Sequence, residues 1–204
     1  QVDWPGFSIG IGAAGMLIAI GAYVRAVKSA PRLALCAIGT GVFMCFTALI
    51  AIFIFALFPL RNPMIDGQLI LADAKLGYDW ASFVTRIADY PTIGTGLGYL
   101  YNSSLPQMVL VILLLGALGR EAELHRFLTV GILAMILAVG FWWLFPSIGP
   151  PAYTSLPEGI AARIGLTTTP EYGTRLMDMV QNGLPVIRPE VINGVIAFPS
   201  YHII

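Results

Sequence analysis

The residues best suited to chemistry lie near the end of the sequence, where Pro199, Ser200 and His202 follow Phe198. Proline fits the first turn of a helix because the N–H it lacks would be unpaired there in any case. The next N–H groups are also unpaired, and with the helix dipole they offer a site for an anion such as phosphate. Ser200 would add a hydrogen bond to a phosphate oxygen. His202 would protonate a leaving oxygen, because histidine titrates near neutral pH.

The same residues also fit a simpler interpretation, in which Ser200 and His202 only cap a helix. A Pro-Ser-x-His pattern is short, so the residues alone leave both interpretations open. The sequence has no cluster of the ligands that a divalent ion needs, so we expect neither a metal nor a cofactor. Cys36 and Cys45 lie in one apolar run without the spacing of a metal site or a disulfide framework, and we expect buried helix residues there.

The composition indicates the kind of protein that must position these residues. The chain has 204 residues, of which 57% are hydrophobic and only 11% are charged. A soluble domain usually carries about 25% charged residues, so this composition argues for a membrane protein. Eleven basic and eleven acidic residues give a net charge of zero. No basic field is left to attract nucleic acid, and that class of partner is excluded.

Long uncharged runs predict the membrane spans. A helix needs about 20 apolar residues to cross a bilayer, and the uncharged runs cover residues 4–24, 33–60, 90–119 and 127–157. Glycine and proline crowd the first half of the third run, so its spanning part is expected at about 105–118, after a surface loop. Pro146 ends the fourth helix after Phe145, and residues 191–204 would open a fifth. We therefore predict an all-α polytopic transmembrane bundle that forms one membrane domain over residues 1–204.

The basic residues between the runs predict the orientation. Arg25, Lys28 and Arg32 lie between the first two helices without an acidic neighbour, and Lys and Arg are retained on the cytoplasmic side. The turn at 119–126 is assigned to the same side. Residues 61–90 and the loop 146–193 then lie outside, facing either the exterior of a plasma or inner membrane or the lumen of an endomembrane.

Residues 61–90 hold an amphipathic helical pattern. Apolar residues recur every three or four positions, while charged residues, Asp66 and Asp73 among them, fall mostly between them. We expect a helix that lies on the membrane surface and is divided near Gly77. It could guide lipid into a site, or it could simply cover the bundle.

Three short stretches resemble the type-2 phosphatidic acid phosphatase superfamily, in the branch of the inositol phosphorylceramide synthases. Residues 194–202, with Phe198-Pro199-Ser200-Tyr201-His202, resemble its second signature, which opens a transmembrane helix. Residues 145–153 resemble the proline-rich segment that follows the preceding helix. Asp73 and residues 76–80 are similar to a juxtamembrane stretch. The order and spacing of these matches agree from the surface helix to the end of the sequence.

The resemblance implies a six-helix enzyme that acts on lipid phosphates or phosphodiesters at the outer or lumenal face. Ser200 and the backbone N–H of Tyr201 would hold phosphate, and His202 would be the general acid. The family's first signature is not evident: Arg188-Pro189 has its dipeptide, but Gln181 stands at the spacing of its lysine. Arg188 could still reach a phosphate, or it could be a solvated loop residue.

The family's nucleophile is a histidine in a third signature on a later helix. The sequence begins with Gln1 rather than Met and stops at Ile204 within an apolar stretch, so we expect a truncated chain that is catalytically incomplete. The sequence leaves open whether the enzyme is a phosphatase or a phosphotransferase, which lipid it uses and its oligomeric state. The alternative is a non-enzymatic transporter or assembly component. The uncharged spans count against a transporter, which usually holds charges or broken helices at mid-membrane depth.

Overall fold

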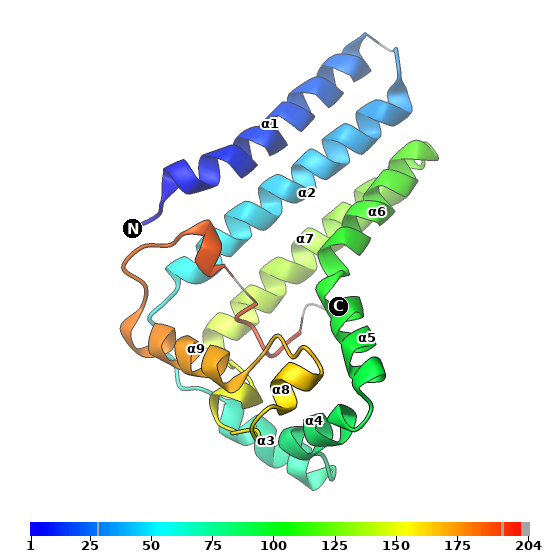
Figure 1. Ribbon diagram of the computed structural model, residues 1–204. Coiled ribbons are helices and arrows are strands. Elements are labelled where there is room, and N and C mark those ends of the chain that lie inside the picture. The colour runs from blue at the N-terminus through cyan, green and yellow to red at the C-terminus, as the bar shows by residue number, and fades with distance from the viewer. Residues whose placement is uncertain (28, 193, 201–204) are drawn as a thin grey trace.

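The computed structural model describes residues 1–27, 29–192 and 194–200, and its regular elements in these residues are all helical. Figure 1 shows long helices running side by side, with the shorter helices α3, α4, α8 and α9 gathered at one end. The α-helices are α1 (Trp4–Ala26), α2 (Pro31–Ala56), α3 (Asp66–Lys75), α4 (Trp80–Ala88), α5 (Pro91–Asn102), α6 (Ser104–Ala117), α7 (Glu121–Leu144), α8 (Ile160–Arg163) and α9 (Pro170–Asn182). Two 3-10 turns, η1 (Pro150–Ala152) and η2 (Pro189–Val191), complete the fold. The all-α prediction is confirmed.

Helices α1 and α2 form an antiparallel hairpin that small residues hold at short range (Figure 1). A methyl group built on Gly21 would lie 2.6 Å from Cγ1 of Ile38, and one built on Gly41 would lie 2.7 Å from Cγ1 of Ile18. Ala14 is fully buried in the same contact. Small residues allow close helix approach in a membrane, where lipid gives little hydrophobic drive for helices to associate. The hairpin therefore depends on these positions.

Helix α6 packs against α2 in the same way. A methyl group on Gly116 would lie 2.8 Å from the backbone nitrogen of Cys36. Beside this contact, Leu35, Phe43, Ile112 and Leu124 form a buried cluster. At this end of the bundle Arg25 pairs with Glu121 at 2.7 Å, which brings the turn after α1 next to the turn before α7. Both turns thus lie at one end, as their common assignment to one side of the membrane requires.

Helices α1, α2 and α7 are long and apolar enough to cross a membrane. The pair α5 and α6 would count as a fourth span, bent by 52° at Ser103. Large apolar side chains on the outside of these helices are exposed, such as Ile9 at 81% and Leu137 at 73%. A solvated protein rarely displays so continuous an apolar surface, whereas a lipid bilayer is a suitable environment for it.

The expected surface loop in the first half of the third run is wrong, because residues 91–102 form helix α5. Pro91 begins the helix, a position that tolerates its missing N–H. Gly94 is buried, and a methyl group there would lie 2.7 Å from Cγ2 of Ile164. The glycine content that suggested a loop instead allows α5 to approach residues 164–165.

The amphipathic segment forms two helices, α3 and α4, divided as predicted near Gly77, which has a φ of 76°. The predicted polar face of the first piece is wrong at one position. Asp66 is the buried residue of α3, with only 2% of its surface exposed. The prediction failed because periodicity places charged residues on the solvated face, whereas Asp66 is buried by a loop distant in the sequence.

A second cluster of buried apolar residues closes the bundle at the end opposite Arg25. It joins Phe55 of α2, Phe58 just after α2, Trp142 of α7, Leu176 and Val180 of α9, and Val195. Helix α7 ends at Leu144, within one residue of the prediction. The fifth helix does not begin at 191: Val191 ends η2, and residues 192 and 194–200 are not helical. The helix expected from Pro199 falls mainly on residues 201–204, which lie outside the described part of the chain.

Candidate functional site

The carboxylate of Asp66 is the most connected polar group at the closed end of the bundle. Among the described residues it accepts hydrogen bonds from the hydroxyl of Ser147 at 2.9 Å and from the backbone N–H groups of Ile148 and Gly149 at 3.1 and 2.7 Å. The hydroxyl of Tyr153 donates to its other oxygen at 3.3 Å. A buried carboxylate is costly unless donors surround it, and hydrogen bonds to a charged acceptor are the strong ones. These bonds hold the loop 146–153 onto the start of α3.

Local sequence explains why this loop has its shape. Pro146 cannot continue α7, and its carbonyl accepts the N–H of Ile65, the residue before α3, at 2.9 Å. The indole N–H of Trp142, in the last turn of α7, donates to the carbonyl of Ser147 at 2.9 Å. Trp142 is fully buried and packs edge-on against Phe58 with ring centroids 5.7 Å apart. The end of α7 and the start of α3 therefore fix the loop from both sides.

Tyr153 is a neutral donor to this carboxylate. Burial, the negative charge of Asp66 and the hydrogen bond to it together raise the pKa of Tyr153 to about 12. The phenol therefore keeps its proton throughout the physiological range. In the described part of the chain, donors contact both oxygens of Asp66 and its side chain is buried, an arrangement suited to holding the donors in place. Its role in this site is to hold the backbone.

The Ser147 carbonyl connects the loop to the segment 194–200. It accepts the N–H of Ala197 at 3.2 Å. Gly149 has a φ of 88°, and a methyl group there would lie 3.0 Å from Cβ of Ala197, so a glycine is needed for this close approach. Phe198 packs edge-on against Phe141 of α7, with ring centroids 5.9 Å apart. Residues 197 and 198 are thus attached to the loop and to α7, directly before Pro199 and Ser200.

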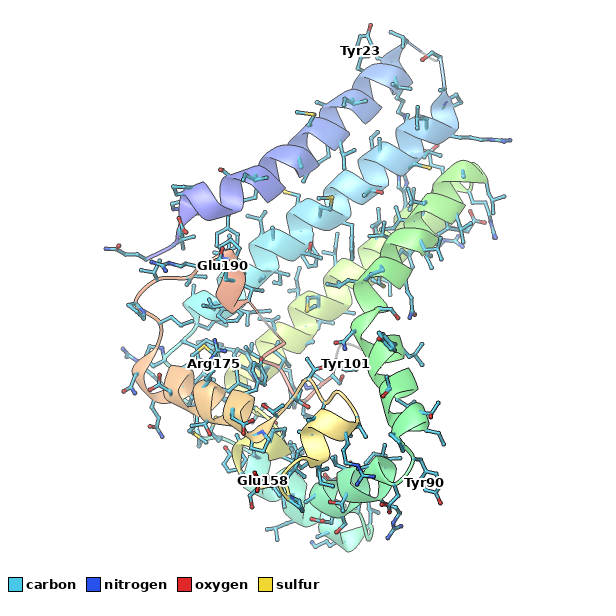
Figure 2. All side chains as sticks on the ribbon, in the orientation of Figure 1. Tyr23, Tyr90, Tyr101, Glu158, Arg175 and Glu190 are labelled. Atoms are coloured by element: carbon cyan, nitrogen blue, oxygen red, sulfur yellow. The ribbon has the colours of Figure 1, made fainter. Side chains whose placement is uncertain are left out.

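Helix α9 holds the same segment from its other side. Its N-terminus is capped by Thr169, whose hydroxyl accepts the N–H of Tyr172 at 3.3 Å. The Tyr172 hydroxyl donates to the carbonyl of Gly194. Burial is the main cause that raises the pKa of Tyr172 to about 12; nearby Tyr101 adds to the shift and the charge of Arg175 opposes it. In the view of Figure 2, Arg175 and Tyr101 lie on opposite sides of the segment 194–200.

The predicted site residues fall in three places. Ser200 is half-buried at the end of the segment that Ser147 and Phe141 hold. Tyr201 and His202 lie outside the described residues. Arg188 is exposed in a hollow beside the N-terminus, lined in part by Gln1, Asp3 and Glu190. The same hollow holds two acidic residues, Asp3 and Glu190, and the phosphate-binding role of Arg188 stays a prediction.

Sequence reasoning missed the residues that hold the loop 146–153 and the segment 194–200, namely Asp66, Ser147, Tyr153 and Tyr172. One signal was available for the loop, because residues 145–153 had been singled out by their resemblance to a proline-rich segment. A serine and a tyrosine at its two ends are natural donors to a carboxylate. The sequence did not indicate which of the eleven acidic residues would accept from them.

Comparisons with known proteins bear on the family of the chain. Neither the curated proteins nor the solved structures give a significant match to this chain. The family model described as the PAP2 superfamily matches residues 67–204, about two thirds of the chain. The matched region begins directly after Asp66 and includes α7, the loop 146–153, α9 and the segment up to Ser200. The type-2 phosphatidic acid phosphatase resemblance of residues 194–202 is thus confirmed at the level of the superfamily, and the chain belongs to the PAP2 superfamily.

Proposed function

We propose that the protein is an integral membrane phosphatase or phosphotransferase that acts on lipid phosphates or phosphodiesters. Ser200 and the backbone N–H of Tyr201 hold the phosphate, and His202 protonates the leaving oxygen. A nucleophilic histidine takes the phosphoryl or phosphoalcohol group, and water or an acceptor hydroxyl then releases it. Superfamily membership supports a phosphatase-type enzyme in general. The lipid, the inositolphosphotransferase branch and the residue roles are part of the proposal.

The observation that carries this proposal is the attachment of residues 197–198 to the end of α7. The Ala197 N–H donates to the Ser147 carbonyl, and Phe198 packs on Phe141 in the last turn of α7, a helix long and apolar enough to cross a membrane. Ser200 therefore lies close to the point at which the chain leaves the apolar part of the bundle. The phosphate of a bilayer lipid lies at the same depth, between the hydrocarbon and water. A water-soluble phosphate ester would not require such a location.

We further propose that this end of the bundle faces the outside or a lumen. The basic turn that contains Arg25 and Arg32 and the turn before α7 lie at the opposite end. Basic residues in short loops are retained in the cytoplasm. Residues 61–90 and 146–193 then belong to the extracytoplasmic side, together with the substrate.

Activity on defined lipids tests the proposal. The full-length protein is reconstituted in vesicles with phosphatidic acid, and phosphate release is measured; transfer of inositol phosphate from phosphatidylinositol to ceramide is measured separately. We expect one of these reactions to exceed that of a protein carrying both Ser200→Ala and His202→Ala. Release alone identifies a phosphatase, whereas transfer supports the inositolphosphotransferase branch. If the wild-type protein shows neither reaction and the double variant is indistinguishable from it, the enzyme proposal fails and a transporter or assembly role takes its place.

A further inference from the structure

Helix α3 is attached to the bundle through a charged residue rather than an apolar one. Asp66 is its buried residue, while Leu71 within the helix and Leu76 at its C-terminal end are 66% and 85% exposed. An aspartate in the first turn of a helix is favoured by the helix dipole, and Asp66 begins α3. The Asp66 contacts and the bond from the Ile65 N–H to the Pro146 carbonyl connect α3 to the end of α7.

The Asp66 carboxylate orients the hydrogen-bond donors of three consecutive residues of the loop 146–153. Ser147 donates its hydroxyl, and Ile148 and Gly149 donate their backbone N–H groups. With these three donors directed at Asp66, the Ser147 carbonyl points away from it and accepts from Trp142 and Ala197. The peptide group between Ser147 and Ile148 therefore contacts Asp66 through its N–H and Ala197 through its carbonyl oxygen. Ala197 lies three residues before Ser200.

Resting on the proposed function, we propose that Asp66 is a positioning residue for the phosphate-binding segment and acts through Ser147 on Ala197, Phe198 and Ser200. It neither touches the substrate nor moves a proton in the reaction. If Asp66 is removed, the N–H groups of Ile148 and Gly149 lose their acceptor, and the loop turns toward water or other acceptors. Ser200 would then move relative to the reacting phosphate, and a displacement of about 1 Å at a reacting centre can cost about 100-fold in rate.

Three variants should lower the activity to different extents. Asp66→Ala removes both carboxylate oxygens that accept these hydrogen bonds. We expect phosphate release or transfer per folded molecule to fall by about 10- to 100-fold. Asp66→Asn keeps one carbonyl oxygen but turns an NH2 group toward the remaining donors, so its activity should fall several-fold, less than that of Asp66→Ala. Ser147→Ala removes one donor and leaves the backbone bonds, so it should cost less than Asp66→Ala. The matched control is Asp89→Ala, an exposed aspartate after α4, for which we expect wild-type activity.

The coupling between substitutions at Asp66 and Ser200 distinguishes a positioning role of Asp66 from a purely structural role. If Asp66 acts by placing Ser200, then Ser200→Ala should cost several-fold less in the Asp66→Asn background than in the wild type, because the serine is already misplaced. In the Asp89→Ala background the cost of Ser200→Ala should be unchanged. Additive effects of Asp66→Asn and Ser200→Ala would overturn the proposal, as would normal activity per folded molecule in Asp66→Ala. An Asp66→Ala protein that does not accumulate leaves the decision to the coupling measurement.

The two proposals can fail separately. If the wild-type protein is active and Ser200→Ala lowers its activity, the proposed function stands whatever Asp66 does. Normal activity of both Asp66 variants would then reject the positioning role alone. An inactive wild-type protein would instead reject the function on which the positioning role rests.

Discussion

The carbonyl oxygen of Ser147 lies 3.2 Å from the backbone nitrogen of Ala197 and accepts its hydrogen bond. This bond joins the segment after α7 to the segment that carries Ser200, across 50 residues of chain. The same serine donates its hydroxyl to Asp66. Ser147 thus contacts a buried carboxylate on one side and the segment that carries Ser200 on the other.

Gly149 provides a test of this junction. Its φ of 88° and the distance of 3.0 Å from a methyl group built there to Cβ of Ala197 predict that Gly149→Ala strains the backbone and pushes Ala197 away. We expect the free energy of unfolding to fall by about 1–3 kcal/mol, together with a loss of activity. The matched control is Gly140→Ala in α7, where a methyl group meets nothing within 4 Å. Thermal unfolding in detergent measures both variants, and an equal response of the two would contradict the close approach.

Gly21 tests the packing of the first two helices. Gly21→Ala places a methyl group 2.6 Å from Ile38 and 3.0 Å from the carbonyl of Ala34, so α1 and α2 must separate. We expect a destabilisation of about 1–3 kcal/mol, the usual range for overpacking. Gly15→Ala on the same helix has open space and is the control. Protein accumulation and thermal unfolding should fall for Gly21→Ala and not for Gly15→Ala; equal accumulation and unfolding would show that the hairpin does not need the small residue.

Tyr153 predicts a pH dependence with a definite sign. Its pKa is raised to about 12 in the folded protein, above the ordinary value of 10, so the folded state favours the protonated phenol. The stabilisation is complete below pH 10 and is lost as the pH rises from about 10 to 12. Tyr153→Phe should therefore lower the thermal midpoint by an amount that is constant between pH 7 and 9. The difference from the wild type should shrink above pH 10, and a difference that grows there would contradict the contact with Asp66.

Topology is tested by labelling in intact cells. Ser155 lies at the closed end of the bundle beyond η1, whereas Ser29 lies in the basic turn between α1 and α2, and both side chains are exposed. A cysteine introduced at Ser155 should react with an impermeant thiol reagent, and one at Ser29 should react only after the membrane is permeabilised. The reverse pattern would place the proposed site in the cytoplasm.

The helices that cross the membrane were predictable because the signals for them are local. Uncharged runs locate α1, α2 and α7, Pro146 ends α7 within one residue of the prediction, and Gly77 divides the surface segment. Helix α5 was missed because its one proline and three glycines lower helix propensity. Tertiary packing reverses that preference at Gly94, where the side chain of Ile164 needs the space of a missing methyl group.

The site itself was only partly predictable. Ser200 was predicted from a short sequence pattern, since the chemistry of a helix start follows from local backbone geometry, and its phosphate-binding role stays a prediction. Asp66 was assigned to a polar face because an aspartate is rarely buried without partners. Its partners, Ser147 and Gly149, are 81 and 83 residues away. Contacts over such a separation have no local signal, so neither periodicity nor composition could indicate the burial.

The two histidines of the chain, His125 and His202, offer the most direct measurement. His125 is exposed in the second turn of α7, at the end of the bundle remote from Ser147. In the full-length protein, His202→Ala should lower lipid phosphate release or transfer per folded molecule by about 10²- to 10⁴-fold, the usual yield of positioned proton transfer. His125→Ala should leave the activity unchanged, and both variants should accumulate to the wild-type level. Full activity of His202→Ala beside an active wild type would contradict the proposed role of His202 as the general acid.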